Sequence, residues 1–178
     1  MAGEIQRYDF VESLFYQDLA VSPELDSYVH GYRLDRIDHA ETSFHHDADE
    51  RLYRLTMACV DQFFISVGKL LKKSGMSVLK MWVQKYERGA YHPVHVHATD
   101  RDNYSFVFYI DCTEESAATM FYNVGFPYVD HGAFKVKPVK GRCVLFPGAM
   151  PHEALPNRDE RRLIVSGNIA YTDLPPSA

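Results

Sequence analysis

Three histidines lie within six residues of one another in this chain. They stand in residues 92–97 (HPVHVH), just after a turn at Gly89. In extended chain, residues two positions apart point to the same face, so we expect the side chains of His95 and His97 to project together. Imidazole is a common ligand of iron, copper, nickel and zinc. The pair predicts half of a metal site, and a third ligand has to come from elsewhere.

The best-placed third ligand is His152, which follows the turn-forming residues 146–151 (FPGAMP). A glycine–proline turn re-aims the chain there, so His152 can be directed toward the first two histidines. Two or three protein ligands with open positions are typical of catalytic rather than structural metal sites. The alternative is that these histidines are polar surface residues in loops, and a short motif by itself does not separate the two.

The remaining histidines have no comparable spacing. His92 is separated from His95 by a proline, so we expect it to face away from the metal or to support a ligand from outside. Five others are expected to be solvated or to cap helices: His30, His39, His45, His46 and His131.

Residues 161–169 (RRLIVSGNI) predict a strand with one unusually polar face. Alternation places Arg162, Ser166 and Asn168 on that face, together with Ile164. A buried arginine must be paired, and its planar guanidinium suits bidentate binding of a carboxylate. Arg162 therefore either pairs with a structural Asp or Glu or binds a carboxylate ligand. Periodicity alone favours the structural ion pair.

One long helix is predicted over residues 49–73. Apolar residues recur there at three- and four-residue spacings, acidic residues stand at its beginning and lysines at its end. Ser74-Gly75 is expected to end it. Weaker periodicity around residues 10–15 predicts a short N-terminal helical segment that Ser22-Pro23 interrupts.

The rest of the chain predicts strands. Short β-branched and aromatic runs separated by Gly- and Pro-containing turns indicate a sandwich or barrel, and the lack of helical crossovers predicts antiparallel pairing. The expected strands are residues 77–87, 104–111, 118–122, 133–137, 142–146 and 161–171. We therefore expect one mainly β (α+β) domain over residues 1–178, with an N-terminal extension (1–48), a supporting helix (49–73) and a β core (77–171).

Composition excludes several classes of function. The 178 residues hold 19 Lys and Arg against 24 Asp and Glu, a net charge of -5 without a basic tract, so duplex nucleic acid is not an expected partner. No apolar run approaches the roughly 20 residues that span a bilayer, and no secretory signal is evident. The three cysteines are widely spaced, which argues against a disulfide framework. We expect a cytoplasmic protein.

The order of these motifs resembles the iron(II)- and 2-oxoglutarate-dependent oxygenases, and within them a group of small members with His-x-His. The resemblance covers roughly residues 79–171 and includes the ten-residue step from His152 to Arg162. It implies a double-stranded β-helix (jelly roll), with Fe(II) held by His95 and His152. It also implies that Arg162 binds the far carboxylate of the co-substrate 2-oxoglutarate, with Ser166 or Asn168 as supporting contacts. Activity would be that of a dioxygenase, by default a hydroxylase of a small molecule, sugar or peptide.

One departure from the resemblance concerns the third ligand. Most members have His-x-Asp or His-x-Glu, whereas His97 stands at the carboxylate position here. His97 is favoured as ligand because it shares a face with His95, and Asp100, Asp102 or water are the alternatives. A three-histidine cupin, acting as a dioxygenase without 2-oxoglutarate or as a binding module, is the competing interpretation. Arg162 argues against it, because a cupin has no need of that residue.

Overall fold

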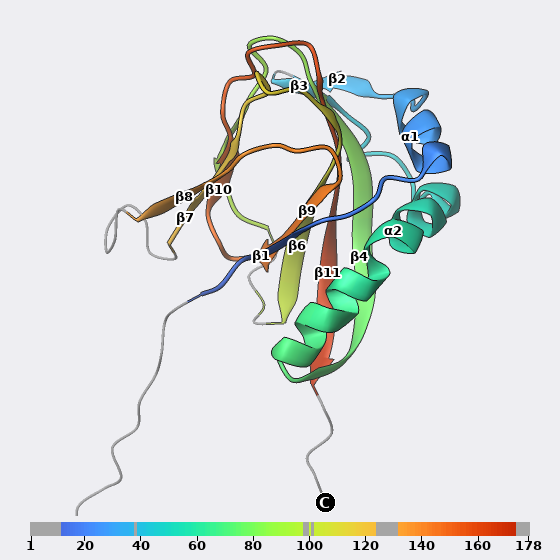
Figure 1. The fold of residues 1–178 in the computed structure, drawn as a ribbon, viewed down its shortest axis with the longest axis vertical. Coiled ribbons are helices and arrows are strands. Elements are labelled where there is room, and N and C mark those ends of the chain that lie inside the picture. The colour runs from blue at the N-terminus through green and yellow to red at the C-terminus, as the bar shows by residue number, and fades with distance from the viewer. Residues whose placement is uncertain (1–11, 38, 98–99, 101, 124–131, 174–178) are drawn as a thin grey trace, which may run out of the picture.

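A computed structural model describes residues 12–37, 39–97, 100, 102–123 and 132–173. Figure 1 shows the arrangement of two helices and eleven strands in this part of the chain. The helices are α1 (Pro23–His30) and α2 (Glu50–Leu70). The strands are β1 (Phe15–Asp18), β2 (Asp35–Ile37), β3 (Ala40–Thr42), β4 (Lys73–Tyr86), β5 (His92–His95), β6 (Asn103–Cys112), β7 (Thr119–Tyr122), β8 (Ala133–Val136), β9 (Arg142–Pro147), β10 (His152–Ala154) and β11 (Arg162–Asp173).

The strands form two sheets that face each other. One sheet has seven strands in the order β1-β9-β6-β11-β4-β3-β2, and the other has four in the order β5-β10-β7-β8. All neighbouring strands run antiparallel. Helix α2 lies along β4 on the outer face of the larger sheet (Figure 1). This arrangement confirms the expected mainly β jelly roll with a long helix packed on a sheet.

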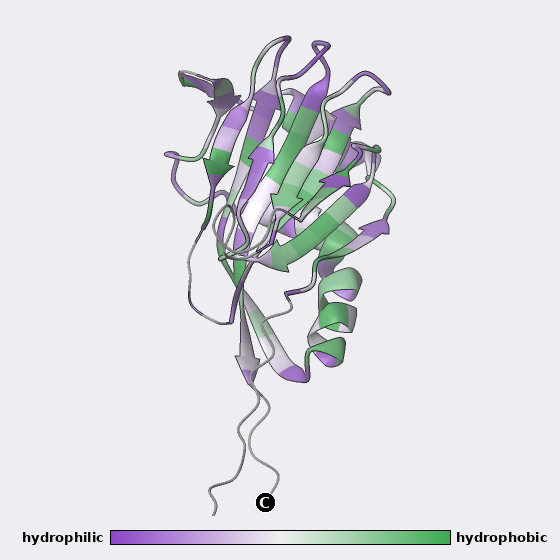
Figure 2. Ribbon diagram, turned by 90° about the vertical axis from the view of Figure 1, so that its left-hand side faces the viewer, coloured by the Kyte–Doolittle hydropathy of each residue, from purple (hydrophilic) through white to green (hydrophobic). Residues whose placement is uncertain are grey.

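Side chains of the larger sheet alternate between two separate cores. An outer core lies between this sheet and the helices and includes Phe64, Val83 and Val165. An inner core lies between the two sheets and includes Tyr86 and Ile164. Figure 2 shows apolar residues along the strands and α2, and hydrophilic residues at the connecting loops. The inner core is the one that holds the chemically interesting side chains.

Helix α2 begins close to its predicted start but ends earlier. The Asp49 carboxylate caps its N-terminus by accepting hydrogen bonds from the backbone N–H groups of Arg51 and Leu52, both at 2.9 Å. The helix ends at Leu70, and Lys72 adopts the left-handed conformation with a φ of 58°. Ser74-Gly75 therefore lies within β4, and the expected stop there was wrong because a lysine supplies the helix-ending turn that we assigned to glycine.

The segment Ser22-Pro23 begins a helix rather than interrupting one. The Ser22 hydroxyl accepts a hydrogen bond from the Leu25 N–H at 3.1 Å, and Pro23 occupies the first turn of α1. Proline suits this position because its missing N–H would have no partner in the helix. Of the helical segment expected around residues 10–15, residues 10 and 11 lie outside the described residues. Residues 12–14 form no helix and Phe15 begins β1, so the prediction was wrong for the part that the structure describes.

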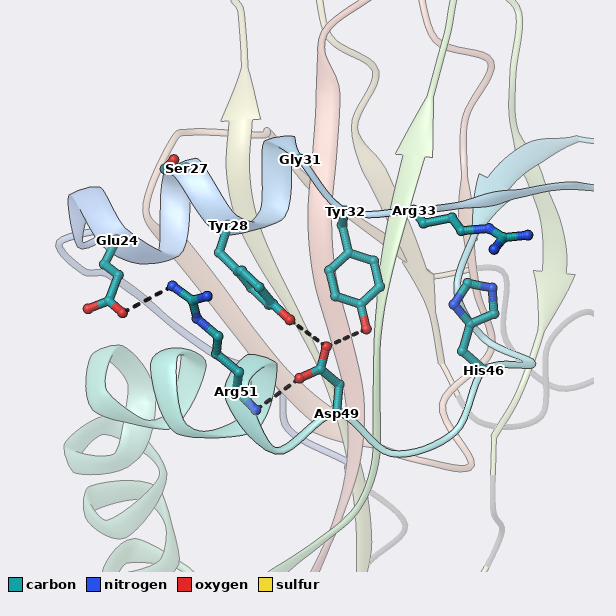
Figure 3. Close-up of a pocket in the computed structure, with 9 residues that line it drawn as sticks. All are labelled: Glu24, Ser27, Tyr28, Gly31, Tyr32, Arg33, His46, Asp49 and Arg51. Carbon is teal, nitrogen blue, oxygen red and sulfur yellow. Dashed lines mark hydrogen bonds and ion pairs between the residues drawn. The ribbon is translucent and has the colours of Figure 1, made fainter.

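A pocket between α1 and the start of α2 is organised by Asp49 (Figure 3). The hydroxyls of Tyr28 and Tyr32 each donate a hydrogen bond to Asp49 Oδ2 at 2.7 Å, while Oδ1 caps α2. Arg51 forms an ion pair with Glu24 at 3.5 Å and lies 4.6 Å from the centre of the Tyr28 ring. These contacts fix α1 to the N-terminus of α2.

Candidate metal centre

The smaller sheet brings three histidines together. Strand β5 pairs with β10 so that His95 lies opposite His152, and His97 follows His95 by two residues. Each of the three offers a ring nitrogen, and these nitrogens all lie within 4.8 Å of one another. His152 is buried, whereas His95 and His97 are partly exposed. The sequence predicted this grouping, and the structure brings these residues together at one end of the inner core.

The orientation of the rings directs nitrogen lone pairs inward. His95 Nδ1 lies 2.8 Å from the Pro93 carbonyl oxygen, and His152 Nδ1 lies 3.0 Å from that of Met150. When the Nδ1 atoms carry the protons and donate them to these carbonyls, the lone pairs of both Nε2 atoms are free to bind a metal ion. His97 Nε2 lies 3.3 Å from His152 Nε2. Two ligands held about 2.0–2.1 Å from one ion are separated by about 2.9–3.4 Å, so the pair fits a shared metal ion.

All three histidines are held neutral. Burial lowers the pKa of His97 to about 4, with a smaller contribution from His95. Burial also lowers the pKa of His95 and brings that of His152 well below its ordinary value. Neutral imidazole is the form that binds metal, so the site is prepared for a cation near pH 7.

Neither alternative carboxylate joins the histidines. Asp102 accepts a hydrogen bond from the Lys73 ammonium, and the exposed Asp100 accepts one from the Asn103 side chain at 3.3 Å. Within the described residues, the only group of three or more potential ligands that converges is that of His95, His97 and His152. The protein contribution to this candidate centre is therefore three uncharged ligands.

Arg162 lies in the inner core without a carboxylate partner. Its side chain is 1% exposed, and its guanidinium lies 4.6 Å from the centre of the Tyr86 ring. Nη2 donates to Thr119 Oγ1 at 2.8 Å, whereas Nε and Nη1 are buried with no hydrogen-bond partner among the described residues. The structural ion pair that periodicity favoured was wrong. Its neighbour Arg161 takes that role instead and pairs with Asp111 at 2.6 Å.

A small cavity of about 30 Å³ connects the histidines with Arg162. Ser166 lines it, as predicted for the polar face of β11. Asn168 is not among the lining residues and accepts a hydrogen bond from the Ser105 hydroxyl at 2.9 Å. The Tyr109 hydroxyl lies 2.6 Å from Thr119 Oγ1 and so joins the hydrogen bonds around Arg162.

Several residues of this cavity were not predicted. Trp82, Gln84 and Tyr86 project into it from β4, and Thr119 does so from β7. The alternating pattern of β4 shows that the first three share a face. Only the pairing of β4 with β11, which sets Tyr86 opposite Arg162 and Trp82 opposite Ser166, shows that this face meets the site.

His92 lies in the site rather than facing away. Its ring stacks on that of His95, with centroids 3.9 Å apart and an angle of 14° between the planes. Its Nδ1 lies 3.5 Å from Gln84 Nε2. Burial is the largest cause that lowers the pKa of His92 to about 4, and the neighbouring histidines and Arg162 add to it. Of the two expectations, support of a ligand from outside describes its position better.

A jelly roll with three converging histidines fits a metal-binding protein, and imidazole ligands suit iron. Residues 81–170, half of the chain, match the family model of the 2OG-Fe(II) oxygenase superfamily, and the chain belongs to this superfamily. It is accordingly an oxidoreductase, a dioxygenase that uses Fe(II) and 2-oxoglutarate. This assignment decides against the cupin interpretation.

Solved structures with similar folds include other members of this class. A prolyl-4-hydroxylase from Pseudomonas putida is 16% identical with a TM-score of 0.62, and the alignment covers 92% of this chain and 94% of that one. The epimerase SnoN from nogalamycin biosynthesis is 14% identical with a TM-score of 0.67, covering 94% and 84%. HygX from Streptomyces hygroscopicus, with nickel, 2-oxoglutarate and hygromycin B bound, is 12% identical with a TM-score of 0.66, covering 89% and 83%.

One comparison gave no match. No curated protein sequence is significantly similar to this chain. None of the helices in the described ranges is both long enough and apolar enough to span a bilayer.

Proposed function

We propose that His95, His97 and His152 hold the Fe(II) ion and that Arg162 binds the far carboxylate of 2-oxoglutarate. Ser166 lines the space between them and serves as a supporting contact. Asn168 is the weaker candidate for such a contact, because it lies outside the lining of the cavity and its side-chain oxygen is engaged by Ser105.

The observation that carries this proposal is the buried, unpaired charge of Arg162. An isolated ion in a protein interior is strongly unfavourable unless it is paired and hydrogen-bonded. Two of the guanidinium nitrogens are buried, and no acceptor for their protons lies among the described residues. A carboxylate that reaches this end of the cavity supplies both the charge and the acceptors. Thr119 and Tyr109 hold the guanidinium in place through Nη2, so the free donors stay directed at the ligand.

When bound, Fe(II) with 2-oxoglutarate and O₂ supplies a two-electron oxidation of the substrate, coupled to conversion of 2-oxoglutarate to succinate and CO₂. The protein's residues bind and orient. Three neutral imidazoles leave the 2+ charge of the ion uncompensated, so the anionic co-substrate is attracted to both ends of its cavity. Phe146 and Phe121, which pack against the His152 ring, keep water away from this side of the site.

We further propose hydroxylation of a small molecule or peptide as the reaction. Support comes from the similar folds, which include a prolyl-4-hydroxylase and a protein with hygromycin B bound. A single domain over residues 1–178, with the helix and N-terminal extension as supports of the β core, is part of this proposal. So is a cytoplasmic location, which agrees with the three free cysteines because reducing compartments keep thiols unpaired.

The test is an anaerobic titration of metal-free protein with Fe(II) and then 2-oxoglutarate, followed by the visible charge-transfer absorption of the iron–2-oxoglutarate complex. We expect a band in the wild type and in the control Arg161→Ala, and its loss at matched concentrations in Arg162→Ala, with Fe(II) affinity retained. Iron binding without any band in the wild type would refute the proposal.

A further inference from the structure

The cavity between the histidines and Arg162 is too small for the co-substrate. Its volume of about 30 Å³ has room for little more than water. Pockets that hold small organic ligands measure about 300–1,000 Å³. Because Arg162 is only 1% exposed, a five-carbon diacid that enters this cavity reaches it only if a lining side chain moves out of the way.

The burial of the lining residues restricts which side chain that is. Of the fifteen residues that line the cavity, twelve are buried, and the three that reach solvent are His92, His95 and His97. His95 and His97 are needed where they are if they hold the metal. His92 is the one lining residue that can turn toward solvent while the candidate ligands and the close-packed inner core stay in place.

His92 is also weakly held. Its ring is held by the stack on His95 and by a contact with Gln84 at 3.5 Å, which is at the long limit for a hydrogen bond. It begins β5, an edge strand that pairs only with β10, and the register of that pairing is irregular between His152 and Ala154. The next two residues, Pro93 and Val94, are exposed, so the ring has solvent to turn into.

We propose that His92 controls the entry of 2-oxoglutarate: its ring closes the cavity by stacking on His95 and must turn outward before the co-substrate binds. This inference rests on the proposed function, because it takes Arg162 as the destination of the co-substrate. It makes His92 a positioning residue that sets how fast and how tightly a 2-oxo diacid binds, without itself touching the reacting atoms.

The experiment is anaerobic stopped-flow mixing of Fe(II)-loaded protein with 2-oxoglutarate. The fluorescence of Trp82, the only tryptophan and 5.9 Å from the His97 ring, reports binding, together with the visible absorption. The variants are His92→Ala, which opens the cavity, and His92→Phe, which keeps a ring that fills it. His39→Ala, a histidine outside the cavity lining, is the matched control. Fe(II) affinity is measured for each, because His92 touches a candidate ligand.

In the wild type and in His39→Ala, we expect the observed rate to level off at high 2-oxoglutarate, since ring movement precedes binding. In His92→Ala it should rise linearly, and the Kd should fall by about two- to twelvefold, the factor that corresponds to losing one aromatic pair. His92→Phe should bind no faster than the wild type. Unchanged or weaker binding of 2-oxoglutarate in His92→Ala, or faster binding in His92→Phe than in the wild type, would overturn this inference but leave the proposed function standing. A wild type that binds no 2-oxoglutarate would overturn the proposed function as well.

Discussion

The Nε2 atoms of His97 and His152 lie 3.3 Å apart, with the Nδ1 of His152 directed at a backbone carbonyl. Two neutral nitrogens that converge in this way are matched by a cation between them. His97→Ala should therefore weaken Fe(II) binding by more than the roughly 10- to 100-fold that loss of an outer partner costs. His97→Asp should bind Fe(II) more tightly than the wild type without 2-oxoglutarate, because it adds a negative charge.

Both variants are measured by anaerobic calorimetry, with His45→Ala as an exposed control. Wild-type Fe(II) affinity in His97→Ala would show that His97 is not a ligand.

Acid should destabilise the metal-free protein already at pH values above those at which carboxylates titrate. The pKa of His92 and of His97 is about 4 in the folded protein, against an ordinary value of 6.5. Between these two values the unfolded chain takes up protons that the folded protein does not, so stability is complete above about pH 6.5 and falls as the pH drops toward 4. The slope is about 1 kcal/mol per pH unit for each histidine.

Urea unfolding at pH 7.0, 6.0 and 5.0 measures this effect. A double variant with His92→Gln and His97→Gln should show a shallower decline over the same range. Equal slopes for the variant and the wild type would contradict the assigned pKa shifts.

Arg162 should contribute to binding at the expense of stability. Arg162→Met removes a buried, unpaired charge and keeps an unbranched side chain of similar reach. Replacing buried ionic groups by apolar ones often stabilises by about 1–4 kcal/mol, and we expect a change in that direction for the ligand-free protein. Urea unfolding checks this.

The same variant should lose the stabilisation that 2-oxoglutarate gives the Fe(II)-loaded wild type, about 2.7 kcal/mol at a hundred times the Kd. 2-Oxopentanoate, which lacks the far carboxylate, should stabilise the wild type much less. Equal stabilisation by both acids would argue against Arg162 as the carboxylate partner.

Asp49→Ala should loosen the N-terminal region without affecting the metal site. The substitution removes the cap of α2, worth about 1 kcal/mol, and the acceptor of two tyrosine hydroxyls. With about 0.5–1.5 kcal/mol for each of the two lost tyrosine hydrogen bonds in addition to the cap, we expect a destabilisation of about 2–4 kcal/mol in urea unfolding. Asp47→Ala, at an exposed position two residues away, should change stability by less than about 0.5 kcal/mol. Similar values for the two variants would exclude this role of Asp49.

The local sequence pattern was sufficient to predict those elements that are long enough to show a clear hydrophobic periodicity. The long helix, and strands such as β6 and β11, were predictable from periodicity and bounding turns. Strands β1, β2 and β3 have three or four residues each. Strands β1 and β3 form because the distant strands β9 and β4 offer them an edge, and β2 in turn pairs with β3. No pattern within such short segments specifies that pairing. Ser22-Pro23 was misjudged because the same dipeptide suits the end of one element and the start of another.

The candidate site likewise has features that the sequence predicts and features that it does not. The shared face of His95 and His97 follows from two-residue alternation, and the inward position of Arg162 follows from the alternation of β11. The stack of His92 on His95 does not, since Pro93 and the irregular pairing of β5 break the alternation between them. That Arg162 has no carboxylate beside it among the described residues was equally hidden, because its neighbours depend on which strands pack against β11.

The outer core and the inner core lie on opposite sides of one sheet, and this separation affects which positions of the sequence can vary independently. Residues that hold α2 against the sheet, such as Phe64 and Val165, share no side-chain face with the histidines or Arg162. Substitutions around the cavity can therefore accumulate while the helix-covered layer continues to hold the chain folded. The same scaffold can in this way acquire new substrates without first being rebuilt.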